Sequence, residues 1–190
     1  MTQFTDAQLL ESCRSGDAAA IEAWVSAHQR PVYRLALSIL DDGSENGAAE
    51  ADEAVQDVFL AALRSLHSFR GDSEPTTWLY AITLNVCRGR LRKRRTRQRL
   101  QRTLTTLFHL QRQAAPPVEA IAIQRIQRSN VWEAVRALPD NQRLAVVLRY
   151  YHRLPLAEIA HIAGCTERTV QNWLHTAHEQ LRLDLSEVEP

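Results

Sequence analysis

Residues 156–170, LAEIAHIAGCTERTV, predict two short helices that are joined by a glycine turn. Ile159 and Ala160 lie on the apolar face of the first helix, where alanine leaves room for two helices to cross closely. Gly164 stands where the turn requires a positive φ, and Thr166 is suited to cap the second helix. This order of features is typical of a helix-turn-helix motif.

The second of these helices places hydrogen-bonding side chains opposite its apolar stripe. Gln171 and Asn172 can hydrogen-bond the edges of adenine, and Arg168 can contact phosphate or guanine. A recognition helix in the major groove of DNA needs this layout, apolar behind and polar in front. The alternative is a plain helical hairpin within a bundle, but the coincidence of all these features favours DNA binding.

A second nucleic-acid signal follows the sequence WLYAITLN at residues 78–85. Residues 88–102 hold nine Lys or Arg residues and no acidic residue, although the net charge of the whole chain is only +1. A lone charge run is usually a solvated helix face. A basic stretch beside an ordered helix also suits a phosphate backbone, and the helix-turn-helix motif favours this second interpretation.

Acidic residues gather before the basic run. No Lys or Arg occurs between Leu35 and Leu63. The acidic residues of this segment are Asp41, Asp42, Glu45, Glu50, Asp52, Glu53 and Asp57. Ordinary solvation of exposed helices would explain the segregation, and so would two surfaces with different partners.

Length and composition predict an all-α protein. A chain of 190 residues has room for one medium domain or two small ones, and scarce glycine with long periodic apolar segments favours helices. Ala-Ala-Pro-Pro at residues 114–117 interrupts the helical pattern and is the best linker candidate. We therefore predict two small helical domains joined by a flexible linker: residues 1–100, the linker 101–126, and residues 127–190 with the helix-turn-helix.

The periodicity also predicts the individual helices. In the N-terminal part we expect helices over 6–15, from Asp17 as N-cap to about residue 41, after the loop 43–49, and from residue 76 into the basic run. In the C-terminal part we expect helices over 120–137, 140–152, 155–163 and 166–184.

Several classes of protein are not expected. Three cysteines lie far apart without a CxxC pair, so the sequence indicates neither a disulfide framework nor a zinc ribbon. It has no Gly-rich phosphate loop, no nucleophile elbow and no paired metal ligands, so we expect no enzyme, no cofactor and no metal site. No segment approaches the ~18 apolar residues of a membrane helix, and no secretion signal is evident, so we expect a cytoplasmic monomer without membrane insertion.

Four segments together resemble the bacterial RNA polymerase sigma factors of the extracytoplasmic-function (ECF) type, over about residues 17–95 and 129–183. They are ADEAVQDVFL at 51–60, SFRGDS at 68–73 with TWLYAI at 77–82 and Asn85, LPDNQR at 138–143 with LRYY at 148–151, and the helix-turn-helix. The resemblance implies a protein that binds core RNA polymerase, directs it to specific promoters and assists melting of the −10 element.

The resemblance also implies a role for each segment. The acidic segment would dock on a coiled coil of the polymerase's largest catalytic subunit, through Asp52, Glu53, Gln56, Asp57 and Leu60. The following loop and helix would bind the −10 element of promoter DNA, through Phe69, Arg70, Asp72, Ser73, Thr77, Asn85, Arg88, Arg92 and Lys93. The C-terminal segments would bind the −35 element, through Arg143, Arg168, Thr169, Gln171, Asn172 and His175.

One departure from the family keeps other readings open. Only Arg168 and Arg182 are basic on the recognition helix, so its anchoring to phosphate should be weak or shared with other residues. A sigma mimic that titrates an anti-sigma factor is one alternative, which the arginine run disfavours. A stand-alone helix-turn-helix regulator is another, although no dimerisation surface is visible. For a true sigma factor, the resemblance implies an anti-sigma factor as a further partner.

Overall fold

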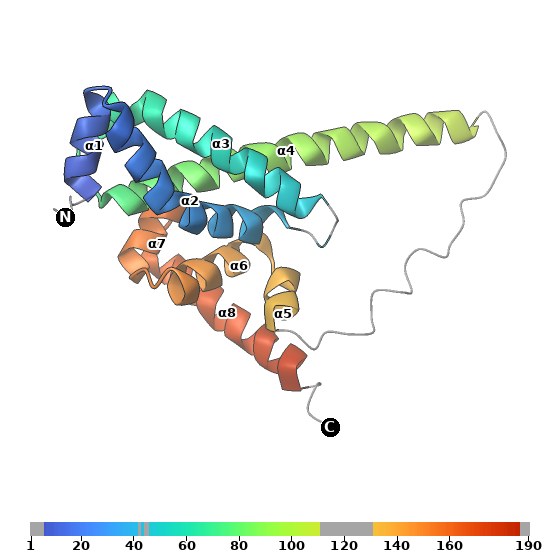
Figure 1. Cartoon of the computed structure of the whole chain (residues 1–190). Coiled ribbons are helices and arrows are strands. Elements are labelled where there is room, and N and C mark those ends of the chain that lie inside the picture. Colours follow the sequence, from blue (N-terminus) through green and yellow to red (C-terminus); the bar gives the residue numbers. More distant parts are fainter. Residues whose placement is uncertain (1–5, 42, 44–45, 111–130, 187–190) are drawn as a thin grey trace.

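The chain folds into helices, and no strand occurs in the residues that the computed structural model describes, which are 6–41, 43, 46–110 and 131–186. The N-terminal unit comprises α1 (Asp6–Arg14), α2 (Ala18–Leu40), α3 (Gly47–Ser65), the 3₁₀ turn η1 (Leu66–Ser68) and α4 (Pro75–Leu110). The C-terminal unit comprises α5 (Val131–Ala137), α6 (Asp140–Val146), the π-helical turn η3 (Val147–Tyr151), α7 (Leu156–Ala163) and α8 (Glu167–Ser186). Figure 1 shows the two units packed against each other.

The N-terminal unit forms as its sequence predicts. Asp17 caps α2, because its carboxylate accepts a hydrogen bond from the amide of Ala19 at 2.9 Å. Trp24 of α2 is fully buried and meets Phe59 of α3 edge-on, with ring centroids 5.4 Å apart. This apolar core fixes α3 and α4 beside α2.

The described helices include no segment with the length and hydropathy of a membrane span.

α4 is the longest of the described helices. Its 36 residues extend about 54 Å at 1.5 Å per residue. The first half buries Leu79, Leu84 and Cys87, whereas most side chains over residues 92–102 are exposed. In Figure 1 its C-terminal end projects beyond the other helices. Residues 101–110 of the predicted linker are therefore helical, and the predicted domain boundaries stay a prediction.

The turn between α7 and α8 confirms the predicted helix-turn-helix geometry. Gly164 has a φ of 70°, in the left-handed region that favours glycine. The Thr166 hydroxyl accepts a hydrogen bond from the amide of Thr169 at 3.2 Å and so caps α8. Behind this turn, Ile159 and Val170 are fully buried and hold the two helices together.

Two predicted helices differ in detail from the structure. The helix expected over 140–152 is α-helical only to Val146 and then widens into η3, where the amide of His152 bonds the carbonyl of Val147. Arg153 follows with a φ of 58°, which ends the helix before Pro155. The helix expected over 120–137 is observed from Val131, because residues 111–130 lie outside the described residues.

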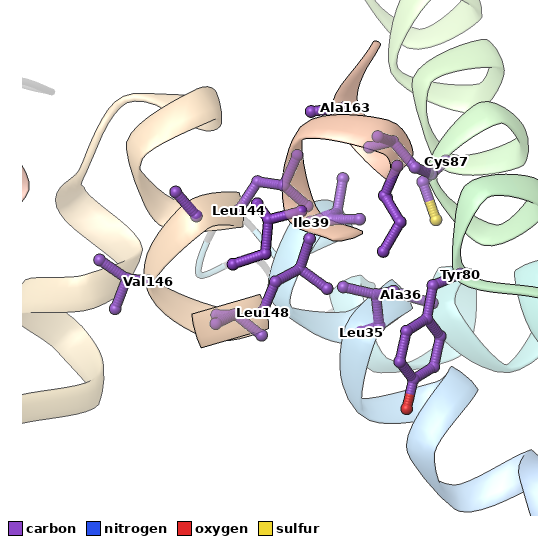
Figure 2. Close-up of a cluster of buried hydrophobic side chains, with 14 of the residues drawn as sticks. Leu35, Ala36, Ile39, Tyr80, Cys87, Leu144, Val146, Leu148 and Ala163 are labelled. Carbon is purple, nitrogen blue, oxygen red and sulfur yellow. The ribbon is translucent and has the colours of Figure 1, made fainter. Parts of the chain in front are cut away.

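One apolar core joins the two units. Leu35 and Ile39 of α2 and Cys87 of α4 belong to the same buried cluster as Leu144 and Leu148 of the C-terminal unit. Figure 2 shows Leu144 and Leu148 beside Ile39 and Leu35, with Cys87 nearby on α4. The sequence leaves the placement of the units open, and the structure supplies direct packing between them.

Candidate nucleic-acid interface

The basic run of α4 is divided between two faces of the helix. Successive residues turn by 100°, so Arg90 and Arg94 share one side, which faces α3. Arg88, Arg92 and Arg95 share another side and line a cavity with residues of α6. Of these five arginines, the sequence predicts DNA contacts for Arg88 and Arg92, and the four-residue spacing of Arg90 and Arg94 carries the signal for the division.

On the side that faces α3, Arg90 and Arg94 form ion pairs with the acidic segment. Arg90 pairs with Glu53 at 3.0 Å and also with Asp57, which accepts hydrogen bonds from two of its nitrogens. Arg94 pairs with Glu50 at 3.2 Å. Partly exposed pairs of this kind contribute about 0.2–1 kcal/mol each, so their main effect is to fix the register of α3 against α4.

The residues predicted to bind core polymerase form a continuous exposed stripe on α3. Every one of them is exposed, and Leu60 at the end of the stripe exposes 52% of its surface. The stripe consists of Asp52, Glu53, Gln56, Asp57 and Leu60. Val58 and Phe59 point the other way and are buried, as expected for an amphipathic helix. The arrangement suits docking of a basic partner that also has an apolar side chain to contact Leu60.

The loop before α4 is attached to α1. Arg14 donates hydrogen bonds to the carbonyls of Leu66, at 3.1 Å, and of Phe69. Thr76 at the other end of the loop donates to the carboxylate of Asp6 at 3.3 Å. The sequence does not mark Arg14 as a functional residue, because no local pattern indicates contacts with residues 52 and 55 positions away.

The loop itself presents several of the predicted −10 contacts to solvent. Arg70 and Asp72 are exposed and Ser73 is half-buried. Phe69 is also half-buried, because its ring packs against Trp78 with centroids 5.0 Å apart. Stacking on a base would therefore require Phe69 to use its remaining exposed face.

Further −10 candidates lie on α4 and differ in accessibility. Asn85, Arg92 and Lys93 are exposed and Arg88 is half-buried. Thr77 is only 1% exposed, because α7 covers it and its hydroxyl donates to Glu158 at 2.6 Å. In this arrangement the C-terminal unit therefore covers one of the predicted DNA contacts of the N-terminal unit.

Most of the predicted −35 residues are accessible on α8. Arg168, Gln171, Asn172 and His175 are exposed, and Thr169 is half-buried beside the helix cap. They lie on the side of α8 opposite its buried stripe, as the sequence predicts. The described part of α8 thus presents a polar, weakly charged surface.

Arg143 is placed differently from the other −35 candidates. It is 9% exposed, and its guanidinium donates to the carbonyls of Arg136 at 2.9 Å and of Ile39 at 3.4 Å. Ile39 lies in the last turn of α2, where carbonyls lack helical partners and cations are favoured. Arg143 therefore connects the two units here, and its contact with DNA stays a prediction.

A half-buried histidine, His152, also lies between the units. Nδ1 of His152 is 2.9 Å from the hydroxyl of Tyr80 on α4, and Nε2 has no hydrogen-bond partner among the described residues. Burial lowers the pKa of His152 to about 4 and raises the pKa of Tyr80 to about 12. Both side chains are therefore neutral near pH 7, which suits a contact that is mostly apolar.

Both units match regions of one protein family. Residues 24–97 match Sigma-70 region 2, which spans most of α2, all of α3 and much of α4. Residues 128–181 match Sigma-70 region 4, which includes α5 to most of α8. The region 2 match contains the acidic stripe and much of the basic helix. The region 4 match follows it in the chain and contains the helix-turn-helix.

Individual relatives agree with these matches. The RNA polymerase sigma-H factor of Pseudomonas aeruginosa is 30% identical over 95% of this chain and 94% of its own length. The ECF RNA polymerase sigma factor SigM of Mycobacterium tuberculosis is 32% identical over 93% of this chain and 83% of its own length.

Solved structures share the fold. CnrH in complex with the cytosolic domain of CnrY has a TM-score of 0.67 and 24% identity, over 97% of this chain and 99% of that chain. The sigma factor RpoE in complex with the anti-sigma factor NepR from Bartonella quintana has a TM-score of 0.65 and 20% identity, over 87% of this chain and 96% of that chain. Both regions occur in order, and the relatives match over most of their own length. The chain therefore belongs to the sigma-70 family of RNA polymerase sigma factors, in its ECF group.

Proposed function

We propose that this chain binds core RNA polymerase, directs it to specific promoters and assists melting of the −10 element. The observation that carries the proposal is the presence of regions 2 and 4 in one chain, with an acidic stripe and a basic helix both exposed on the first. The polymerase would supply the catalysis, so the chain needs no active site and would act in the cytoplasm with its partner.

The acidic stripe of α3 is the proposed docking site for polymerase. Its carboxylates suit an ionic rim against a basic coiled coil, which chiefly sets specificity and the rate of association. Arg90 would act as a positioning residue, because it holds the carboxylates of Glu53 and Asp57 while leaving both side chains exposed.

The loop of residues 69–74 and the exposed residues in the first half of α4 are the proposed −10 site. Melting must overcome a mean stacking energy of about 1.4 kcal/mol per base-pair step. Asp72 and Ser73 have the short polar side chains that capture an unstacked base, and Asn85 lies on α4 after them. Arg92 and Lys93 would bind phosphates, so promoter binding should weaken steeply with salt.

DNA binding as proposed requires the two units to separate. Thr77 lies under α7 and Arg143 lies against α2, so neither side chain reaches DNA while the units are packed together. Core polymerase and promoter DNA would then stabilise the separated arrangement, because they bind surfaces on both units.

An anti-sigma factor is the proposed regulatory partner. RpoE of Bartonella quintana was solved with the anti-sigma factor NepR, and CnrH with the cytosolic domain of CnrY. A partner of this class would compete with polymerase or DNA for the exposed surfaces of α3, α4 and α8.

Run-off transcription with purified core polymerase tests the proposal, on a promoter candidate from DNA upstream of the protein's own gene. We expect Asp52→Arg and Asn85→Ala each to reduce the transcript at least about tenfold, equivalent to about 1.4 kcal/mol. Asp52→Arg should also lose binding to core polymerase in a pull-down, whereas Asn85→Ala should keep it.

Two substitutions on the exposed side of α2 serve as controls. Glu22→Arg matches the charge reversal and Gln29→Ala matches the loss of an amide, and both should transcribe as wild type. Absence of any binding to core polymerase would contradict the proposal. Binding to an anti-sigma factor without transcription would then favour the sigma mimic, and specific DNA binding without polymerase would favour the stand-alone regulator.

A further inference from the structure

The cavity between α4 and α6 has the features of an anion site. It has a volume of about 220 Å³ and is lined on one side by Arg88, Arg92 and Arg95 of α4, and on the other by Asp140 and Asn141 of α6. We propose that it binds a compact multivalent phosphate anion, with pyrophosphate as the simplest example. The volume lies below the ~300–1,000 Å³ of sites for drug-sized ligands, so it suits a diphosphate group better than a whole nucleotide.

The charge inside the cavity is not balanced. Arg88 and Arg92 make no ion pair with any residue that the structure describes. Asp140 is the acidic residue of the lining, and its carboxylate is bound by Arg95 at 2.8 Å and by Arg143 at 3.2 Å. Two positive charges of the lining therefore have no ion-pair partner in the described part of the chain.

The opposite side of α4 provides an internal comparison. There Arg90 and Arg94 pair with Glu50, Glu53 and Asp57 in a groove that Lys93 and Arg97 also line. The lining of this groove has four basic and three acidic residues, a net charge of +1, whereas the lining of the cavity has three basic residues and one acidic residue, a net charge of +2. A multivalent anion is expected to choose the cavity.

The geometry of the cavity also suits phosphate. Arg88, Arg92 and Arg95 are spaced four and three residues apart, so they follow one face of the helix at about 6 and 4.5 Å along its axis. Guanidinium groups form paired hydrogen bonds with phosphate oxygens, and the Asn141 amide adds a neutral donor from α6.

The floor of the cavity is apolar. It is formed by Ile39, Leu84, Leu91 and Leu144, which come from both units. Apolar walls reduce the local dielectric constant and strengthen the attraction between the anion and the guanidinium groups. An ion at this site would contact α4 and α6 together and so stabilise the packing of the units.

The consequence for promoter binding rests on the proposed function. Arg88 and Arg92 are also proposed contacts for promoter phosphates, so the anion and the promoter would compete for the same side chains. The site itself can be tested without either polymerase or DNA, so failure of one proposal would be distinguishable from failure of the other.

Calorimetric titration of the full chain with pyrophosphate, at constant ionic strength, measures the site. We expect saturable binding of one anion to the wild type. Arg88→Gln and Arg92→Gln should each weaken it at least about tenfold, as expected for loss of hydrogen bonds to a charged group. Arg97→Gln removes one charge from the same basic run but not from the cavity, and it should bind as wild type.

A further variant tests the contribution of α6. Asn141→Asp adds a carboxylate to that wall, so it should also weaken binding at least about tenfold while the unfolding temperature without anion stays near that of wild type. Unchanged affinity of Asn141→Asp would overturn the interunit site, because the anion would then bind α4 alone. Equal losses in Arg97→Gln and Arg92→Gln would overturn it too, since binding would follow only the total charge.

The source of the phosphate group is tested with the same titration. A nucleoside diphosphate that binds more tightly than pyrophosphate would support the site with a nucleotide end as its ligand, and the reverse would support the free ion. Heat that does not saturate, or that sodium chloride of equal ionic strength reproduces, would overturn the proposal.

Discussion

α4 and α8 are both proposed to contact promoter DNA, yet they differ sharply in charge. α4 carries nine Lys or Arg residues over 88–102 without an acid, whereas α8 balances Arg168 and Arg182 with three acidic residues. Phosphate contacts give affinity without sequence preference, and contacts with base edges give specificity. The difference in charge supports a proposal in which α4 supplies affinity for DNA and α8 supplies sequence specificity.

The two helices also differ in how their first turns are held. α8 begins with local devices, the left-handed Gly164 and the cap of Thr166. The loop before α4 depends on Arg14, a side chain from another helix. α8 is therefore positioned by residues next to it in the chain, and α4 by long-range contacts.

The largest expected effect comes from removing the charge of α4. Replacing Arg88, Arg92 and Lys93 together by Gln should weaken promoter binding by the holoenzyme about a hundredfold near physiological salt, and reduce the slope of log K against log salt by about 2.7. Fluorescence anisotropy across a salt series measures both. Arg168→Gln on α8 should change the slope by no more than about 0.9, and equal slope changes in the two variants would contradict the assignment.

The contact between α4 and the C-terminal unit should be sensitive to acid. The pKa of His152 is lowered from 6.5 to about 4 in the folded chain, so the unfolded chain binds a proton first as the pH falls. The contribution of His152 to the free energy of unfolding should therefore be fully present above pH 6.5. The free energy of unfolding should fall by about 2–3 kcal/mol between pH 6.5 and 4.

Urea unfolding at a series of pH values measures this loss. His152→Gln should lack that part of the pH dependence, and His67→Gln should keep it, because His67 is exposed. An unchanged profile in His152→Gln would show that other groups cause the acid sensitivity.

A smaller effect is expected from the loop before α4. Arg14→Ala removes two hydrogen bonds to loop carbonyls, so promoter melting should fall about tenfold while binding to core polymerase is unchanged. Fluorescence of 2-aminopurine in the −10 element reports melting directly. Arg30→Ala, an exposed residue of α2, is the control, and equal melting by Arg14→Ala and wild type would remove Arg14 from the site.

The smallest effect is expected from a substitution that makes α8 more basic and so reduces its difference in charge from α4. Gln171→Arg adds one positive charge to the exposed face of α8, so affinity for DNA with a −35 element should rise about threefold at low salt. The salt slope should become steeper by about 0.9. No change in slope would place residue 171 away from the phosphate backbone.

The features that the sequence predicts correctly are determined by residues that lie close together in the chain. The cap at Asp17, the turn at Gly164 and the cap at Thr166 each follow from one residue and the helix beside it. Arg143 is different, because its burial depends on the carbonyl of Ile39, which is 104 residues away. Such a contact leaves no periodic or local pattern, so the sequence could not reveal that a predicted DNA contact lies between the units.

The candidate site shows the same limit. Exposure of the polymerase stripe follows from the helical period of α3 and could be predicted. Burial of Thr77 under Glu158 could not, because it depends on docking of the two units. The assigned roles of all these residues in binding polymerase and DNA stay predictions until the variants are measured.

The hydrogen bond between Thr77 and Glu158 has a consequence for how promoters are occupied. If only the separated units bind DNA, the observed dissociation constant is the intrinsic one divided by the fraction of separated molecules. Each 1.4 kcal/mol of packing between the units then weakens the observed affinity about tenfold. A substitution at buried Leu148 would thus change the expression of every target gene in the same direction, without altering any side chain that touches DNA.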